Sequence, residues 1–103
     1  MGKYVLAYTG GTMAETEAEQ QAVMEQWMNW FGALGESVLD GGSPFGPSST
    51  VSPGGLADGG RSSLTGYSIV SAESLAEACE KAKGCPVLSS GGSVEVYESL
   101  PIG

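Results

Sequence analysis

The chain has 103 residues and a formal net charge of −8, with 12 acidic residues against four basic ones. This size and composition are typical of a single globular domain over residues 1–103. The four cations, Lys3, Arg61, Lys81 and Lys83, are scattered, which excludes the cationic patch that nucleic acid or an anionic membrane needs. No apolar run approaches the roughly 20 residues that span a bilayer, and the first residues lack the basic-then-apolar order of a signal peptide. We therefore expect a cytoplasmic protein with no nucleic-acid or membrane partner.

The first two predicted elements are a buried strand and a long helix. The stretch KYVLAYT, residues 3–9, is apolar at odd and even positions, which is typical of a strand buried on both faces. A helix is expected over residues 15–34, because Thr16 and Glu19 form a capping box and Thr12 with Glu15 offers a second one. Gly35 suits the C-terminal cap of this helix.

Apolar residues recur along this helix at helical spacing and predict a stripe that faces a core. The stripe consists of Val23, Trp27, Trp30, Phe31 and Leu34. The two tryptophans are equally compatible with the wall of a pocket.

A stretch dense in glycine, serine and proline follows at residues 41–60, after a short expected strand over residues 37–40. Such composition marks turns, although residues 50–52 are compatible with a brief strand. Long loops in compact domains are often functional or mobile. The paired glycines of the chain lack the lysine of a phosphate-binding loop, so we interpret them as turns.

The C-terminal third, residues 64–102, is predicted to form a strand, a capped helix and a last strand. The first strand covers residues 64–70, and Ser74 with Glu77 forms the capping box of the helix. Gly84 and Pro86 end that helix. Residues 93–98 alternate between valines and polar residues, which predicts the last strand.

The apolar face of the second helix includes Cys79, at helical spacing with Leu75, Ala78 and Ala82. We expect Cys79 to be buried as a small hydrophobic residue. The chain has two cysteines and no histidine, which is too few ligands for a zinc site and excludes a Cys–His pair. We expect no metal and no cofactor.

The order of these elements predicts an α+β fold, with a ferredoxin-like antiparallel sheet that carries both helices on one face. The strands at residues 4–8 and 67–70 are apolar on both sides, so the uncovered face must contact something. A homodimer that pairs sheet face to sheet face is the simplest arrangement.

Several short motifs occur in order along nearly the whole chain. They are Lys3-Tyr4, Gly41-Gly42 with Pro44-Phe45-Gly46-Pro47, Leu64-Thr65-Gly66-Tyr67-Ser68-Ile69, Ser74-Leu75 with Glu77-Ala78, Gly84-Cys85-Pro86-Val87, and Gly91-Gly92-Ser93-Val94-Glu95-Val96. In these motifs the chain resembles the YCII-related proteins, including the DGPF-type branch. The resemblance implies the dimeric α/β-barrel version of the ferredoxin-like fold.

The chain departs from this family where catalysis has been proposed. Some members are thought to use a histidine on the first helix and an aspartate before a proline in the second half. Here there is no histidine, and Cys85 precedes Pro86. The DGPF motif is also absent, since Asp58-Gly59-Gly60 lacks the Pro-Phe step. The His–Asp pair therefore does not carry over, and catalysis stays open.

Two carboxylates are weak catalytic candidates. Asp40 ends a short strand beside a glycine turn, where it could act as a general base or accept backbone N–H bonds and hold the turn. Glu95 is expected on the sheet face away from the helices, in the cavity of a dimer or at its rim. Tyr8, Tyr67 and Ser68 are expected to point into that cavity. The pocket candidates are Tyr8, Trp27, Ser43, Tyr67 and Ser68.

Three functions are compatible with this sequence. The first is a homodimer with a modest apolar pocket for a small organic molecule and no catalytic role. The second is a lactone, isomerase or lyase enzyme that uses acid–base chemistry through Asp40 or Glu95 with Tyr8 or Tyr67. The third is a protein-interaction module whose acidic first helix docks a basic partner.

Overall fold

The computed structural model describes residues 1–11, 15–60 and 62–101. Its elements are β1 (Gly2–Thr9), α1 (Glu17–Leu34), η1 (Gly35–Ser37), β2 (Val38–Pro44), β3 (Ser49–Ser52), β4 (Gly55–Asp58), β5 (Leu64–Ala72), α2 (Leu75–Ala82), η2 (Pro86–Ser90) and β6 (Ser93–Ser99). The main sheet has the order β2-β5-β1-β6, with antiparallel pairing at each junction. The predicted α+β class is confirmed, and the order is compatible with a ferredoxin-like arrangement. The sheet is open, with β2 and β6 at its edges.

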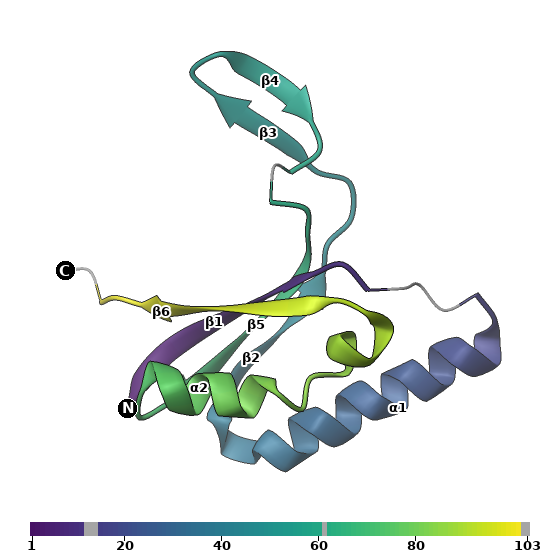
Figure 1. The fold of residues 1–103 in the computed structure, drawn as a ribbon, viewed down its shortest axis with the longest axis vertical. Coiled ribbons are helices and arrows are strands. Elements are labelled where there is room, and N and C mark those ends of the chain that lie inside the picture. The colour runs from purple at the N-terminus through teal and green to yellow at the C-terminus, as the bar shows by residue number, and fades with distance from the viewer. Residues whose placement is uncertain (12–14, 61, 102–103) are drawn as a thin grey trace.

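Both helices cover the same face of the sheet (Figure 1). Alternate residues of β1 point toward them, so Tyr4, Leu6 and Tyr8 belong to the core together with Trp30 of α1 and Val70 of β5. On the opposite face, Val5 lies beside Ile69 and Tyr97, and Ala7 lies beside Tyr67 and Glu95. No helix or strand covers that second face in the described part of the chain.

The capping box that begins α1 is confirmed. The Glu19 N–H donates to Thr16 Oγ1 at 3.1 Å, and Glu19 Oε2 accepts the Glu15 N–H at 3.1 Å. The alternative pair of Thr12 with Glu15 lies outside the described residues, as do Arg61 and Ile102. At the other end, Gly35 caps the helix with φ 57°.

The core-facing stripe of α1 is shorter than predicted. Trp30 is buried, and Trp27, Phe31 and Leu34 pack against the core, whereas Val23 is exposed. The helix therefore contacts the sheet only along its C-terminal half.

The expectation that Cys79 is buried is wrong. Ser74 caps α2 as predicted, since its Oγ accepts the Glu77 N–H at 3.1 Å. The residues of α2 that face the sheet are Ala78 and Ala82, one helical turn apart. Cys79 lies about 100° farther around the helix axis and is exposed, whereas Cys85 is buried.

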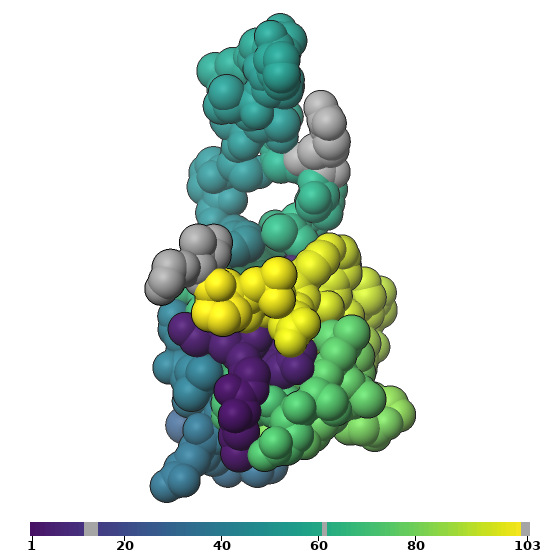
Figure 2. Space-filling view, turned by 90° about the vertical axis from the view of Figure 1, so that its left-hand side faces the viewer, coloured from purple at the N-terminus to yellow at the C-terminus, as the bar shows by residue number. Residues whose placement is uncertain are grey.

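Residues 41–60 are more regular than their composition predicts. β2 continues to Pro44, and the strand expected at residues 50–52 pairs with β4 in a separate two-stranded hairpin. Figures 1 and 2 show this hairpin standing away from the main sheet and the helices. Its Val51 and Leu56 are cross-strand neighbours that are 81% and 75% exposed.

Among the described residues, no helix combines the length and the hydrophobicity that a membrane-spanning helix needs.

Candidate functional site

A cavity of about 540 Å³ lies between α1 and the β2–β5 strand pair. One wall comes from α1, where Met24, Trp27, Met28 and Phe31 line the cavity at i, i+3, i+4 and i+7. The two methionines are 64% and 69% exposed. A ligand in the cavity would cover apolar surface that water now contacts.

Aromatic rings brace the inner part of this wall. The ring of Trp27 meets that of Tyr8 edge-on at a centroid distance of 5.1 Å, and it lies 5.9 Å from Phe31. The indole of Trp30, 5.7 Å from Trp27, donates a 3.1 Å hydrogen bond to the Lys81 carbonyl. This contact joins the C-terminal half of α1 to the end of α2.

The opposite wall is backbone-rich, because glycines let β2 approach β5 closely. Two register shifts in β2, one on each side of Asp40, each add one residue relative to β5. Gly42 has φ 71°, and a Cβ atom there would lie 1.7 Å from the Tyr67 carbonyl oxygen. At Gly66 a Cβ would lie 3.1 Å from the Ser43 carbonyl oxygen. The close backbone approach that a strand glycine predicts at Gly66 is therefore made by β2.

A chain of hydrogen bonds crosses the inner end of the cavity. The Tyr8 hydroxyl donates to Ser68 Oγ at 2.7 Å, and Ser68 Oγ donates to the Gly41 carbonyl at 2.7 Å. Burial raises the pKa of the Tyr8 phenol well above its ordinary value, and the bond to Ser68 lowers it only in part. The phenol is therefore neutral at physiological pH.

All five residues proposed for a pocket line this one cavity. They are Tyr8, Trp27, Ser43, Tyr67 and Ser68. The cavity lies between helix and sheet, however, and not between two sheets. Tyr8 and Ser68 point toward the helices, contrary to expectation, because they occupy the helix-facing positions of β1 and β5. Tyr67, next along the strand, follows the opposite parity, and its ring stacks on Phe45 at 5.8 Å.

The two candidate carboxylates lie outside the cavity lining. Asp40 is exposed, and its Oδ1 accepts the Gly42 N–H at 2.8 Å. Of the two roles expected for Asp40, this bond corresponds to the one that holds the glycine turn. Its Oδ2 accepts the Tyr67 hydroxyl at 3.3 Å. Glu95 is also exposed and accepts a short hydrogen bond from Tyr97. The charge of Asp40 raises the pKa of Tyr67, and the hydrogen bond to Glu95 raises that of Tyr97.

Sequence reasoning missed several residues of the cavity. Met24 and Met28 were not proposed, although their i, i+3, i+4, i+7 spacing with Trp27 and Phe31 is visible in the sequence. The predicted apolar stripe begins at Val23, on the neighbouring face of the helix, and therefore does not include Met24 or Met28. The sequence gives no comparable signal for Gly41, which contributes backbone to the wall.

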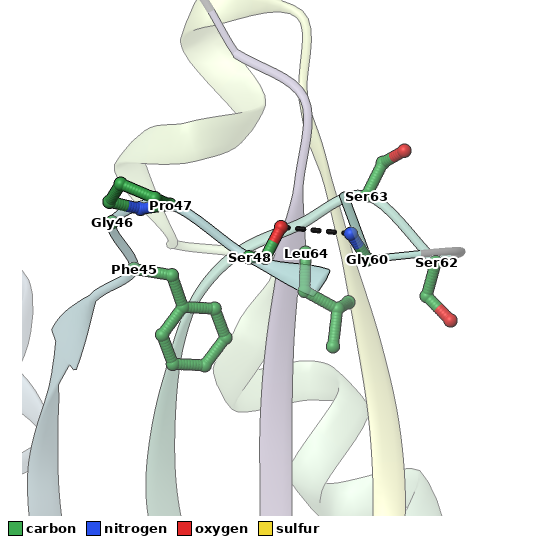
Figure 3. A pocket seen from close by; sticks show the side chains of 8 residues that line it. All are labelled: Phe45, Gly46, Pro47, Ser48, Gly60, Ser62, Ser63 and Leu64. Atoms are coloured by element: carbon green, nitrogen blue, oxygen red, sulfur yellow. Dashed lines mark hydrogen bonds between the residues drawn. The ribbon is translucent and has the colours of Figure 1, made fainter. Parts of the chain in front are cut away.

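A second hollow, of about 390 Å³, lies at the base of the hairpin (Figure 3). It is framed by residues 45–48 on one side and residues 60 and 62–64 on the other. The Gly60 N–H donates to Ser48 Oγ at 2.8 Å across this base. Three serines and the apolar side chains of Phe45, Pro47 and Leu64 line this hollow, which is smaller than the cavity beside α1.

Within the described residues, no group of three or more histidine, cysteine, aspartate or glutamate side chains is arranged to hold a metal ion. Cys85 is buried, and burial raises the pKa of its thiol to about 11. Comparisons with known protein families, with curated proteins and with solved structures gave no match to this chain.

Proposed function

We propose that the protein is a cytoplasmic, YCII-like homodimer that binds a small organic molecule in the cavity between α1 and the β2–β5 pair. The observation that carries this proposal is the cavity itself. Its volume of about 540 Å³ lies in the range of small-molecule sites, and its walls combine aromatic and methionine side chains with a few inward hydroxyls.

The exposed methionines support binding at this place. Methionine is flexible and polarizable, and it adapts to the shape of an apolar partner. Met24 and Met28 flank Trp27, so a planar ligand would contact both thioethers and the indole. Covering each side chain contributes about 1 kcal/mol, at roughly 25 cal/mol per Å² of apolar surface.

Titration with the neutral dye Nile red tests this proposal. The fluorescence of the dye rises when it leaves water, and the double variant Met24→Gln/Met28→Gln should bind it about 10- to 30-fold more weakly than the wild type. Val23→Gln is the matched control, because it removes an exposed apolar side chain from the same helix outside the cavity. Equal affinity for the double variant and the control would reject this cavity as the site.

The homodimer is proposed from the open face of the sheet. Val5, Ala7 and Ile69 form the centre of that face, and both helices lie on the other side. Pairing two such faces would bury the rest of Val5 and Ile69, which are half-buried in one chain, whereas Ala7 is buried already. It would give the dimeric α/β barrel that the family resemblance implies.

Acid–base catalysis is a second candidate, favoured by one observation. Asp40 with Tyr67, and Glu95 with Tyr97, place two tyrosine–carboxylate pairs on or beside this open face. In a face-to-face dimer, these groups would lie near the interface. If the wild-type protein converts a substrate, and both Asp40→Asn and Glu95→Gln lose this activity while they still bind Nile red, the enzyme is favoured over the binding protein.

A further inference from the structure

The hydroxyl groups at the inner end of the cavity already donate their protons to hydrogen bonds within the protein. A carbonyl oxygen can only accept, so the bond from Ser68 Oγ to the Gly41 carbonyl uses the single proton of Ser68. Ser68 has no other proton to give, and the bond that joins it to Tyr8 must therefore be donated by the phenol. One backbone carbonyl thus fixes the direction of both bonds.

The same argument applies to the hydroxyls of two further lining residues, of which Tyr67 carries its ring on the opposite face of the sheet. Thr65 Oγ1 donates at 3.2 Å to the backbone carbonyl of Tyr8, and the Tyr67 hydroxyl donates to the carboxylate of Asp40. Both acceptors lack a proton that could reverse the bond. Ser43, exposed at the rim, is the remaining hydroxyl among the described lining residues.

The backbone N–H groups and the charges of the described lining residues also favour a neutral ligand that donates a hydrogen bond. The Gly42 N–H is given to Asp40, and Pro44 has no N–H at all. The described residues that line the cavity include no lysine, arginine, aspartate or glutamate. A charged ligand would therefore lose water without gaining an ionic partner.

We infer that the cavity takes a neutral, largely apolar molecule with a hydroxyl or N–H group that donates a hydrogen bond to the remaining lone pair of the Tyr8 hydroxyl, since Ser68 is fully buried behind it. This inference rests on the proposed function, because it names the chemistry of the ligand in the same cavity. A ligand whose polar group only accepts would find no free proton on the Tyr8 hydroxyl and would lose its own bonds to water.

Three compounds of the same ring system test the inference. Calorimetric titration of the full chain at pH 7 compares 2-naphthol, which donates, with 2-methoxynaphthalene, which only accepts, and with the 2-naphthoate anion. We expect 2-naphthol to bind about tenfold more tightly than 2-methoxynaphthalene, and naphthoate to bind most weakly. Equal affinities, or tightest binding of naphthoate, overturn the inference and leave the binding function standing.

The Tyr8→Phe variant locates the acceptor. Its preference for 2-naphthol should fall to about twofold or less, whereas Tyr97→Phe, which removes a phenol outside the cavity, should keep the wild-type ratio. An unchanged preference in Tyr8→Phe overturns the assignment to Tyr8. If the Tyr8→Phe variant does not fold, the relative affinities of the wild-type protein for the three compounds still test the inference. Failure of all three compounds to bind saturably rejects the proposed function, and the inference with it.

Discussion

The backbone of Gly42 passes so close to Tyr67 that a Cβ atom at position 42 would lie 1.7 Å from the Tyr67 carbonyl oxygen. Gly42 also has φ 71°, a conformation that residues with a side chain rarely adopt. The contact lies between the shifted segment of β2 and the middle of β5, beside the cavity. Position 42 therefore sets the path of the backbone that forms one cavity wall.

Replacement of Gly42 by alanine should lower the free energy of unfolding by about 2–5 kcal/mol, because backbone strain and a steric clash both oppose the methyl group. Gly41→Ala is the matched control. Its Cβ would meet no atom within 4 Å, and its φ is not positive, so the change should stay within about 1 kcal/mol. Urea denaturation followed by tryptophan fluorescence measures both, and equal losses would contradict this account of the wall.

The two thiols should differ strongly in reactivity. Cys79 is exposed, whereas Cys85 is 2% exposed and has a thiol pKa raised to about 11 by burial. The thiolate is the reactive form, so at pH 8 roughly one Cys85 in a thousand carries it. Treatment of the native protein with a disulfide reagent should label Cys79 first and Cys85 at least a hundredfold more slowly. Cys79→Ser should abolish the fast phase, and a fast phase that survives this change would contradict the assignment.

Local patterns predicted the N-terminal cap of each helix, because a capping box depends on two residues three positions apart, although the first helix begins at Glu17 and not at residue 15 as expected. Thr16 with Glu19 and Ser74 with Glu77 occupy the expected positions at the start of each helix. The face that a helix buries is harder to infer. In α2 the small residue Ala78 faces the sheet and its neighbour Cys79 does not, although both are compatible with a core.

The position of the cavity could not be predicted from the chain alone. Periodicity placed Tyr8 and Ser68 on definite parities of β1 and β5, but it did not say which parity faces the helices. The β4 strand was missed because its sequence, GLAD, contains no β-branched residue. The Pro53-Gly54 step before it is a turn signal that points to the hairpin.

The hairpin should be separable from the rest of the fold. Its strands pair only with each other in the sheet pattern, and the Gly59 N–H donates to the Ser48 carbonyl at 2.8 Å, so the ends of residues 49–58 lie together. Replacement of these ten residues by two glycines should change the melting temperature by no more than a few degrees. The intact double variant Val51→Thr/Leu56→Thr serves as a control for loss of exposed apolar surface alone. Failure of the shortened chain to fold would show that the hairpin supports the main sheet.

The proposed dimer makes a prediction about Val5. This side chain lies at the centre of the open face, opposite Ile69 and beside Tyr97, and a stable interface there would bury about 800 Å² on each protomer. In Val5→Glu, a carboxylate from each protomer would lose water inside the interface, so the mass measured by light scattering at micromolar concentration should fall from dimer to monomer.

Val23→Glu, on the exposed part of α1, introduces the same charge away from that face and should leave the mass at that of a dimer. Tryptophan fluorescence distinguishes a folded Val5→Glu monomer from an unfolded chain, because Trp30 is buried against the end of α2 only in the folded state. A wild-type protein that is monomeric at the same concentration would contradict the dimer. It would leave the cavity unaffected, because α1, β2 and β5 of one chain supply most of the cavity wall.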